Sequence, residues 1–160
     1  MEVPATRLAT ATDVHSLDAL RMAFLAEVSG ADPADAALLA ALRRYFAAAV
    51  PAGEFVAAVA DHGGRVVASI GLAYHRLPPS PTNPAGCEPY VMNMYTLPAW
   101  RGRGPATALL GRSADVARGG GCCRVCPHTL PLARSVYARA GFVPGDGEMR
   151  LDLREAPGGP

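Results

Sequence analysis

The sequence predicts a single α/β domain whose sheet has mixed strand order. Short apolar runs bounded by glycine or proline alternate with segments in which apolar residues recur at helical spacing. The chain has 160 residues, half of them hydrophobic, so it is long enough for one domain with a packed core. Since no internal repeat or linker divides it, we expect one domain over residues 1–154 and a disordered tail over residues 155–160.

The first part of the chain is expected to form a strand and two helices. Residues 6–9 suit a short strand, and Thr12 or Asp13 can cap the helix that follows. Apolar residues then recur at helical spacing as far as Gly30, which ends this helix. A second helix is expected over residues 32–49, started by an aspartate and a proline and closed by a proline and a glycine.

The middle of the chain predicts three strands and a helix. Two apolar runs, at residues 54–60 and 65–75, surround a glycine-rich turn and therefore suit a β-hairpin. Residues 76–89 contain five prolines and are expected to form a loop. The run YVMNMYTL at residues 90–97 then suits a strand, and PATALLGRSADVAR at residues 105–118 suits a helix.

After the glycines that end this helix, CCRVC at residues 122–126 suits a strand, LARSVYARA at residues 132–140 a short helix, and residues 142–153 a final strand pair. The cysteine spacing, followed by His128, also matches part of a zinc site, but such a site needs about four ligands. Only Cys87 stands apart, and it has no neighbouring cysteine or histidine. We therefore interpret CCRVC as a buried strand in which cysteine acts as a small hydrophobe, and we expect no bound metal.

Charge and hydropathy argue against several classes of protein. The formal net charge is +1, whereas nucleic-acid binders are usually basic. No apolar stretch reaches the roughly 18 residues of a membrane span, and the N-terminus lacks the basic and apolar segments of a secretory signal. We expect a cytoplasmic protein without a membrane partner. All fifteen basic residues are arginine, which together with the many alanines is typical of a GC-rich bacterial genome.

A glycine- and arginine-rich elbow, Arg101 to Gly104, joins the predicted strand at residues 90–97 to the helix at residues 105–118. Such a unit points several backbone N–H groups at one spot, where the helix N-terminus adds partial positive charge. The elbow therefore predicts a site for a phosphate or pyrophosphate. The pattern G-x-G-x-x-G is not matched, because Thr107 stands three residues after Gly104, and the chain has no lysine for a Walker loop. A plain strand–helix connection with solvated arginines is the alternative.

Two motifs extend this hypothesis. RGRGPA, from Arg101 to Ala106, fits R-x-x-G-x-A, and SVYARAGF, from Ser135 to Phe142, ends in a tyrosine, a glycine and a phenylalanine at fixed spacing. Together they resemble the GNAT superfamily of acyl-CoA-dependent N-acyltransferases, and NMYTLPAWRGRGPATALL is close to small bacterial members. The resemblance covers nearly the whole chain. It implies the GNAT fold, a mixed and mostly antiparallel sheet that is splayed at its middle strands and flanked by helices.

The resemblance implies a binding site for acetyl-CoA. Backbone amides of the elbow and of the next helical turn would hold the pyrophosphate, with charge from Arg101 or Arg103. The preceding strand would pair with the pantetheine arm, and the thioester would lie where that strand splays from the strand of Val125. Pro105 replaces the branched apolar residue usual in the family, which suits a first helical turn but removes one N–H donor. The implied cofactor-binding residues are Met94, Tyr95, Thr96, Arg101, Gly102, Arg103, Gly104, Pro105, Ala106 and Thr107.

Tyr137, in SVYARAGF, is expected to be the general acid that protonates the departing thiolate. A free tyrosine has a pKa of about 10 and a thiol one of about 8.5, so the phenol stays protonated at neutral pH and can donate. Packing in the core is the alternative role. The general base stays open, because Val125 stands where some members carry glutamate. His128 at the end of that strand is the best-placed candidate, and the others are Glu88, His75 and Glu54.

The predicted function is transfer of an acetyl group from acetyl-CoA to a primary amine of a small molecule or peptide, by direct attack in a ternary complex. The loop at residues 76–89 and the first two helices should line the acceptor side. The sequence does not identify the acceptor, and it leaves open whether the protein forms a homodimer. Pro105, and Leu130 where many members have asparagine or serine, alter the cofactor side. One alternative is therefore another donor, namely a different acyl-CoA, an acyl carrier protein or an aminoacyl-tRNA. The other is a non-catalytic anion-binding module of the same fold.

Overall fold

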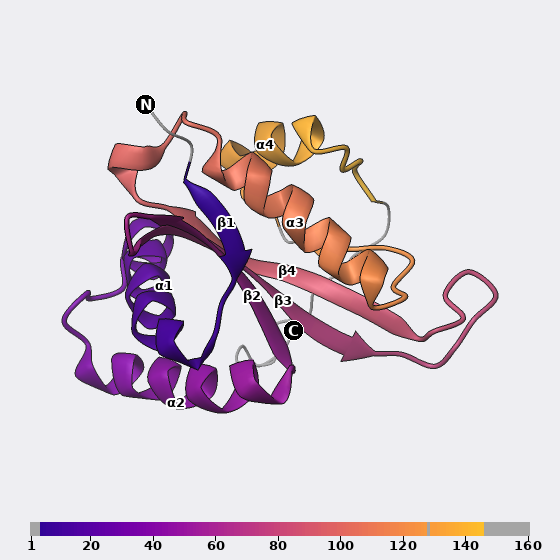
Figure 1. The fold of residues 1–160 in the computed structure, drawn as a ribbon, viewed down its shortest axis with the longest axis horizontal. Helices are drawn as coiled ribbons and strands as arrows, with labels where there is room; N and C mark the ends of the chain where they lie inside the picture. The colour runs from indigo at the N-terminus through magenta and orange to yellow at the C-terminus, as the bar shows by residue number, and fades with distance from the viewer. Residues whose placement is uncertain (1–3, 128, 146–160) are drawn as a thin grey trace, which may run out of the picture.

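A five-stranded sheet forms the centre of the computed structural model, which describes residues 4–127 and 129–145 (Figure 1). The strands follow the order β1-β2-β3-β4-β5, and β1 to β4 are antiparallel neighbours, whereas β4 and β5 are parallel. The mixed, mostly antiparallel sheet is thereby confirmed. The strands are β1 Ala5–Leu8, β2 Phe55–His62, β3 Arg65–Arg76, β4 Cys87–Thr96 and β5 Cys126–Pro127.

Helices cover both faces of this sheet (Figure 1). Helices α1 and α2 share one apolar cluster with β2, and helices α3 and α4 share another with β2, β3 and β4. Because side chains of a strand alternate between faces, a strand buried on both sides reads as a continuous apolar run, as in FVAAVA. The helices are α1 Val14–Ser29, α2 Ala36–Ala52, α3 Pro105–Gly119 and α4 Arg134–Arg139, with single 3-10 turns η1 Ala11–Asp13, η2 Pro98–Trp100 and η3 Pro131–Ala133.

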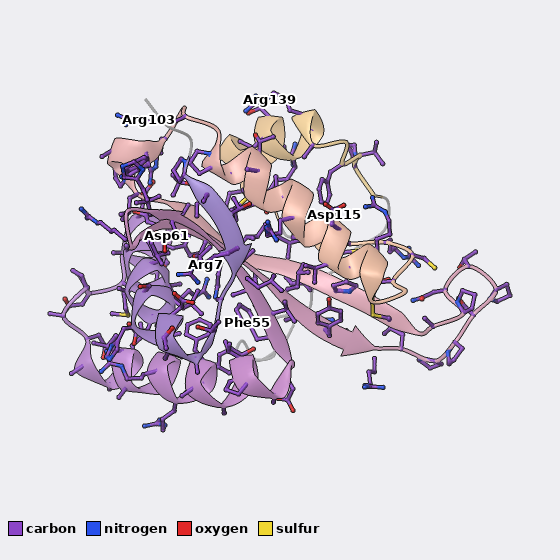
Figure 2. All side chains as sticks on the ribbon, viewed as in Figure 1. Arg7, Phe55, Asp61, Arg103, Asp115 and Arg139 are labelled. Atoms are coloured by element: carbon purple, nitrogen blue, oxygen red, sulfur yellow. A yellow bond between two sulfur atoms is a disulfide. The ribbon has the colours of Figure 1, made fainter. Side chains whose placement is uncertain are left out.

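The packing of α2 on the sheet depends on one glycine of β3. The ring of Phe55, which is 1% exposed, occupies the space that a side chain on Gly71 would need. Phe55 in turn packs against Phe46 of α2, with ring centroids 5.3 Å apart. Figure 2 shows Phe55 between α2 and the strands.

The start of the second helix differs from the expectation. The helix begins at Ala36, because the side chain of Asp35 accepts a hydrogen bond from the N–H of Leu38 at 2.9 Å. Asp32 instead closes a turn by accepting from the N–H of Ala34 at 2.8 Å. The expected start at residue 32 was therefore wrong, although the first helix does end at Gly30, whose φ is 67°.

The cysteine segment also differs from the expectation. Only Cys126 of CCRVC lies in a strand, Cys123 is exposed, and Cys122 forms a disulfide with Cys87, whose Cα lies 5.2 Å away. The interpretation of CCRVC as a buried strand was wrong. The two cysteines are 35 residues apart in sequence, but β5 runs beside the start of β4 and so brings them together. Disulfides are rare in cytosolic proteins, which speaks against the expected cytoplasmic location. That location remains a prediction.

Parts of the expected structure lie outside the described residues. These are most of the final strand pair at residues 142–153, the tail at residues 155–160, and His128. Among the residues described, no group of three or more histidines, cysteines or acidic residues could hold a metal ion. Within the same ranges, no helix is both long and apolar enough to cross a bilayer.

Candidate active site

The centre of the candidate site is a bulge in β4. Met92 pairs with Gly71 of β3 and Tyr95 pairs with Ser69, so two residues of β4, Asn93 and Met94, lie opposite a single residue of β3. A bulge of this kind kinks the strand and interrupts its hydrogen bonds. Asn93 has a φ of 55°, the one positive value at a non-glycine residue among those described.

The side chain of Asn93 is incompletely satisfied. Its Oδ1 atom is buried and has no hydrogen-bond partner within the described residues, although its backbone oxygen accepts a bond from the Ser69 hydroxyl at 3.4 Å. An unpaired buried carbonyl costs about 1–3 kcal/mol. Backbone strain and an unpaired polar atom in one residue indicate a functional position. Our sequence reasoning missed Asn93, although one polar residue inside the apolar run YVMNMYTL was the available signal.

Beyond the first residues of β4, its edge toward β5 is open. Strand β5 pairs only with Tyr90 and Val91, so no strand of the described chain lies beside β4 from Met92 to Thr96 on that edge. This is the splay expected at the middle of the sheet. Met94, Tyr95 and Thr96, named from the sequence as partners of pantetheine, all lie on this stretch. Backbone groups on an open strand edge can pair with an extended ligand.

The elbow connects this open edge to the N-terminus of α3. Gly102 and Gly104 have φ values of 74° and 92°, and a Cβ atom on either would meet no atom of the described residues within 4 Å. Pro105 occupies the first helical position and is buried. The backbone N–H groups of Ala106 and Thr107 make no hydrogen bond to any described residue. The elbow therefore has the open space, the free donors and the helix dipole that an anion requires.

The two elbow arginines are both engaged by protein groups. Arg101 donates to Glu27 of α1 at 2.6 Å and to the backbone oxygen of Thr96 at 3.1 Å. The Tyr95 hydroxyl donates to the same carboxylate at 3.2 Å, so these contacts tie the end of α1 to β4.

Arg103 lies at the elbow (Figure 2) with its guanidinium 5.3 Å from the centre of the Trp100 ring. For both arginines, contact with a cofactor phosphate remains a prediction.

Tyr137 lies in the core cluster on the α4 side of the sheet. It is 5% exposed, packs edge-on against Phe142 at 5.3 Å, and belongs to the cluster against which Met94 packs. Burial, and secondarily the neighbouring Tyr90, raise the pKa of Tyr137 to about 12. The hydroxyl is therefore protonated at neutral pH. Tyr90 itself lies on β4 where that strand pairs with β5.

The candidate general bases are scattered. Glu88 is paired with Arg124 at 2.9 Å, and the ring of His75 stacks on Tyr90 with centroids 5.9 Å apart. Glu54 is exposed just before β2. No described candidate stands over the open part of β4, so the general base remains unassigned.

Comparisons with known proteins agree with this geometry. The sequence profile of the acetyltransferase (GNAT) family matches residues 17–142. A predicted acetyltransferase from Clostridium acetobutylicum, solved with acetyl-CoA, is 30% identical, with a TM-score of 0.84 and coverage of 96% of this chain and 98% of that chain. A GCN5-related N-acetyltransferase from Ralstonia eutropha is 27% identical, with a TM-score of 0.81 and coverage of 94% and 99%. None of the curated proteins matches.

More distant structures share the fold alone. Glucosamine-6-phosphate N-acetyltransferase from Arabidopsis thaliana is 14% identical, with a TM-score of 0.69 and coverage of 95% of this chain and 99% of that chain. The family match spans most of the sequence, including the bulged strand, the elbow and Tyr137. The chain therefore belongs to the GNAT family of acetyltransferases and is an acyltransferase.

Proposed function

We propose that this protein transfers an acetyl group from acetyl-CoA to a primary amine of a small molecule or peptide, by direct attack in a ternary complex. The observation that carries this proposal is the continuity of the open edge of β4 with the elbow. A pantetheine arm that pairs with the backbone of Met94 to Thr96 would lead directly to the free N–H groups at the start of α3. The similar Clostridium protein was solved with acetyl-CoA, which supports this donor.

The elbow would hold the diphosphate of the donor through backbone amides. Gly102, Arg103, Gly104, Ala106 and Thr107 can each present an N–H group, whereas Pro105 cannot. Proline at the first helical position loses no intrahelical hydrogen bond, because that N–H has no partner inside the helix. One donor fewer leaves the site usable, since the remaining amides and the helix dipole still favour an anion.

The transfer itself requires few protein groups. The neutral amine attacks the thioester carbonyl, the new C–N bond forms, the C–S bond breaks, and the amine proton passes to water. Holding both reactants side by side supplies much of the rate. Tyr137 would donate a hydrogen bond to the charge that builds on sulfur. A free thiol has a pKa of about 8.5, which is below that of the phenol, so full transfer of the phenol proton to the thiolate is unfavourable in water. It becomes favourable only where burial also raises the pKa of the thiol.

Asn93 would complete the site when substrates bind. Its unpaired Oδ1 can accept a hydrogen bond from an N–H group, either of the pantetheine arm or of the acceptor amine. Both ligands bring N–H donors to the stretch of β4 at which Asn93 lies. The cost of the unpaired atom in the free protein would then be recovered on binding.

Replacing Asn93 with glycine should stabilise the protein and impair it. Glycine adopts a positive φ freely, and the unpaired carbonyl, which costs about 1–3 kcal/mol, is removed. Against this stands about 0.5–1 kcal/mol of extra chain entropy for glycine. We expect the free energy of unfolding to rise by about 1 kcal/mol and kcat/KM to fall about tenfold or more. Denaturant unfolding and steady-state kinetics measure the two effects, and lower stability with unchanged kinetics would assign Asn93 a purely structural role.

The proposed function is tested by a thioester-consumption screen. Purified protein is mixed with acetyl-CoA and a panel of small amines and peptides, and release of free CoA is followed with a thiol reagent. Acetylated product is then confirmed by mass spectrometry. We expect acetyl-CoA to be consumed only when an amine acceptor is present. Consumption of other acyl-CoA donors in its place would favour the alternative donor, and binding without any turnover would favour the non-catalytic module.

A further inference from the structure

Helix α1 carries an arginine that has no acidic partner among the described residues. Arg21 is half-buried, and its one recorded interaction among the described residues is with the ring of Phe24, whose centre lies 5.2 Å from its guanidinium carbon. The acidic residues of α1 are engaged elsewhere. Asp18 accepts from Arg43 of α2 at 2.8 Å, and Glu27 accepts from Arg101 at 2.6 Å. The helix thus retains one unneutralised cation that is partly withdrawn from water.

The neighbours of Arg21 along the helix show on which face of α1 this arginine lies. Leu17, one turn earlier, packs in the cluster of α1, α2 and β2, against which Met92 of β4 also packs. Phe24, one turn later, contacts Tyr95 of β4 with ring centroids 6.3 Å apart. Residues three and four apart on a helix share a face. Arg21 therefore lies on the face that α1 turns toward the sheet, one side chain away from Tyr95 and the bulged stretch of β4.

A cation in this setting favours binding of an anion. Burial lowers the pKa of Arg21, which reflects the loss of hydration by a charge that no carboxylate compensates. The guanidinium remains charged at any physiological pH, and its planar fork matches a carboxylate or phosphate group through two parallel hydrogen bonds. A bound anion would replace the lost hydration.

The donor is not the source of this anion. The proposed site for the CoA diphosphate is the elbow at the start of α3, and α3 packs with α4 on the opposite face of the sheet from α1. Arg101 of the elbow does reach the α1 face, but Glu27 of α1 already pairs with it. We therefore assign the anion that approaches Arg21 to the acceptor and not to the diphosphate of CoA.

We propose that Arg21 binds an anionic group of the acceptor, so that the preferred substrates are amines that also carry a carboxylate or a phosphate. This inference rests on the proposed acetyl transfer and adds the class of acceptor to it. Arg21 then acts by holding the acceptor with its amine toward the bulge of β4. Since such a contact is present both before and during reaction, its loss should raise KM more than it lowers kcat.

The test uses matched acceptor pairs that differ only in charge. One arm compares L-amino acids with their C-terminal amides, and the other compares glucosamine 6-phosphate with glucosamine. The amine of an amino acid amide is less basic than that of the acid, so more of it is neutral at pH 7. A preference for the acid cannot then arise from amine reactivity. We expect the wild-type protein to prefer the anionic member in at least one arm, and the arm that shows it identifies carboxylate or phosphate.

The variants are Arg21→Gln, Arg21→Lys and, as a matched control, Arg44→Gln on the exposed surface of α2. Arg21→Gln should lower kcat/KM for the anionic acceptor by about 10- to 100-fold, the loss expected for charge-assisted hydrogen bonds. It should leave the neutral member within about threefold, because that member has no anion to lose. For Arg21→Lys, kcat/KM for the anionic acceptor should lie between the values of the wild type and Arg21→Gln, since lysine keeps the charge but lacks the planar fork of donors. Arg44→Gln should match the wild type.

Three outcomes would overturn the proposal. Equal use of both members of every pair by the wild-type protein would do so without reference to any variant. An equal loss for charged and neutral acceptors in Arg21→Gln, with a lower melting temperature, would show a structural role for Arg21. Absence of CoA release with every acceptor would overturn the proposed acetyl transfer and this inference with it, whereas the first two outcomes leave acetyl transfer intact.

Discussion

Replacing Tyr137 with phenylalanine should reduce turnover by about 10²–10⁴-fold, the range expected when a general acid is lost. Phenylalanine keeps the ring that packs against Phe142 in the core and deletes only the hydroxyl. The affinity for acetyl-CoA and the melting temperature should therefore change little. Single-turnover kinetics, calorimetry and thermal unfolding of the same preparations measure these three quantities separately.

A second tyrosine provides the control for this experiment. Tyr74 is half-buried, packs against the same cluster as Tyr137, and likewise has a pKa that burial raises, but it lies on β3 away from the open edge of β4. Tyr74→Phe should retain wild-type turnover. If Tyr137→Phe stays within about threefold of wild type, Tyr137 is a packing residue and the thiolate takes its proton from water.

The pH dependence provides an independent test of Tyr137. Burial raises its pKa to about 12, so the hydroxyl holds its proton throughout the usual range of assays. The rate should rise with pH as the acceptor amine loses its proton and should then stay level up to about pH 11. A descending limb centred at about pH 10, the value of a free tyrosine, would show that the phenol is not buried in the working enzyme.

The elements that depend on local chemistry were predictable from the sequence. Glycine and proline act on the backbone at their own positions, so Gly30 and the elbow before Pro105 could be located without knowledge of the fold. The second helix shows where this approach fails, because Asp32 and Asp35 are both suitable caps. The choice between them depends on the turn at residues 32–35.

Features that depend on contacts distant in sequence could not be predicted. The disulfide of Cys87 and Cys122 requires β5 to lie beside β4, and the sequence alone does not specify that pairing. The bulge at Asn93 depends on the register of β4 against β3. Likewise, that Arg21 has no acidic partner in the described part of the chain becomes evident only once Asp18 and Glu27 are seen to pair with other arginines. Two of these features, Asn93 and Arg21, carry the finer proposals about substrate binding.

Replacing Gly104 with valine should weaken binding of acetyl-CoA by about 100-fold or more. A Cβ at this position meets no atom of the described residues within 4 Å, so a side chain would occupy open space at the N-terminus of α3, where we propose that the diphosphate binds. A diphosphate would be displaced from at least two charge-assisted hydrogen bonds, each of which contributes about tenfold. Titration calorimetry of the wild-type and variant proteins with acetyl-CoA measures the difference.

The control must account for backbone strain, because Gly104 has a φ of 92° and valine is disfavoured there. Gly53 has the same backbone strain but lies outside the proposed site. It ends α2 with a φ of 71°, and a Cβ on it also meets no atom of the described residues within 4 Å. Gly53→Val and Gly104→Val should both lower the free energy of unfolding by about 1–3 kcal/mol, but Gly53→Val should bind acetyl-CoA like the wild type. Acetylpantetheine lacks the diphosphate, so its affinity should be the same for all three proteins. Equal affinities of Gly104→Val and Gly53→Val for acetyl-CoA would contradict the elbow as the phosphate site, because strain alone would then account for the whole effect.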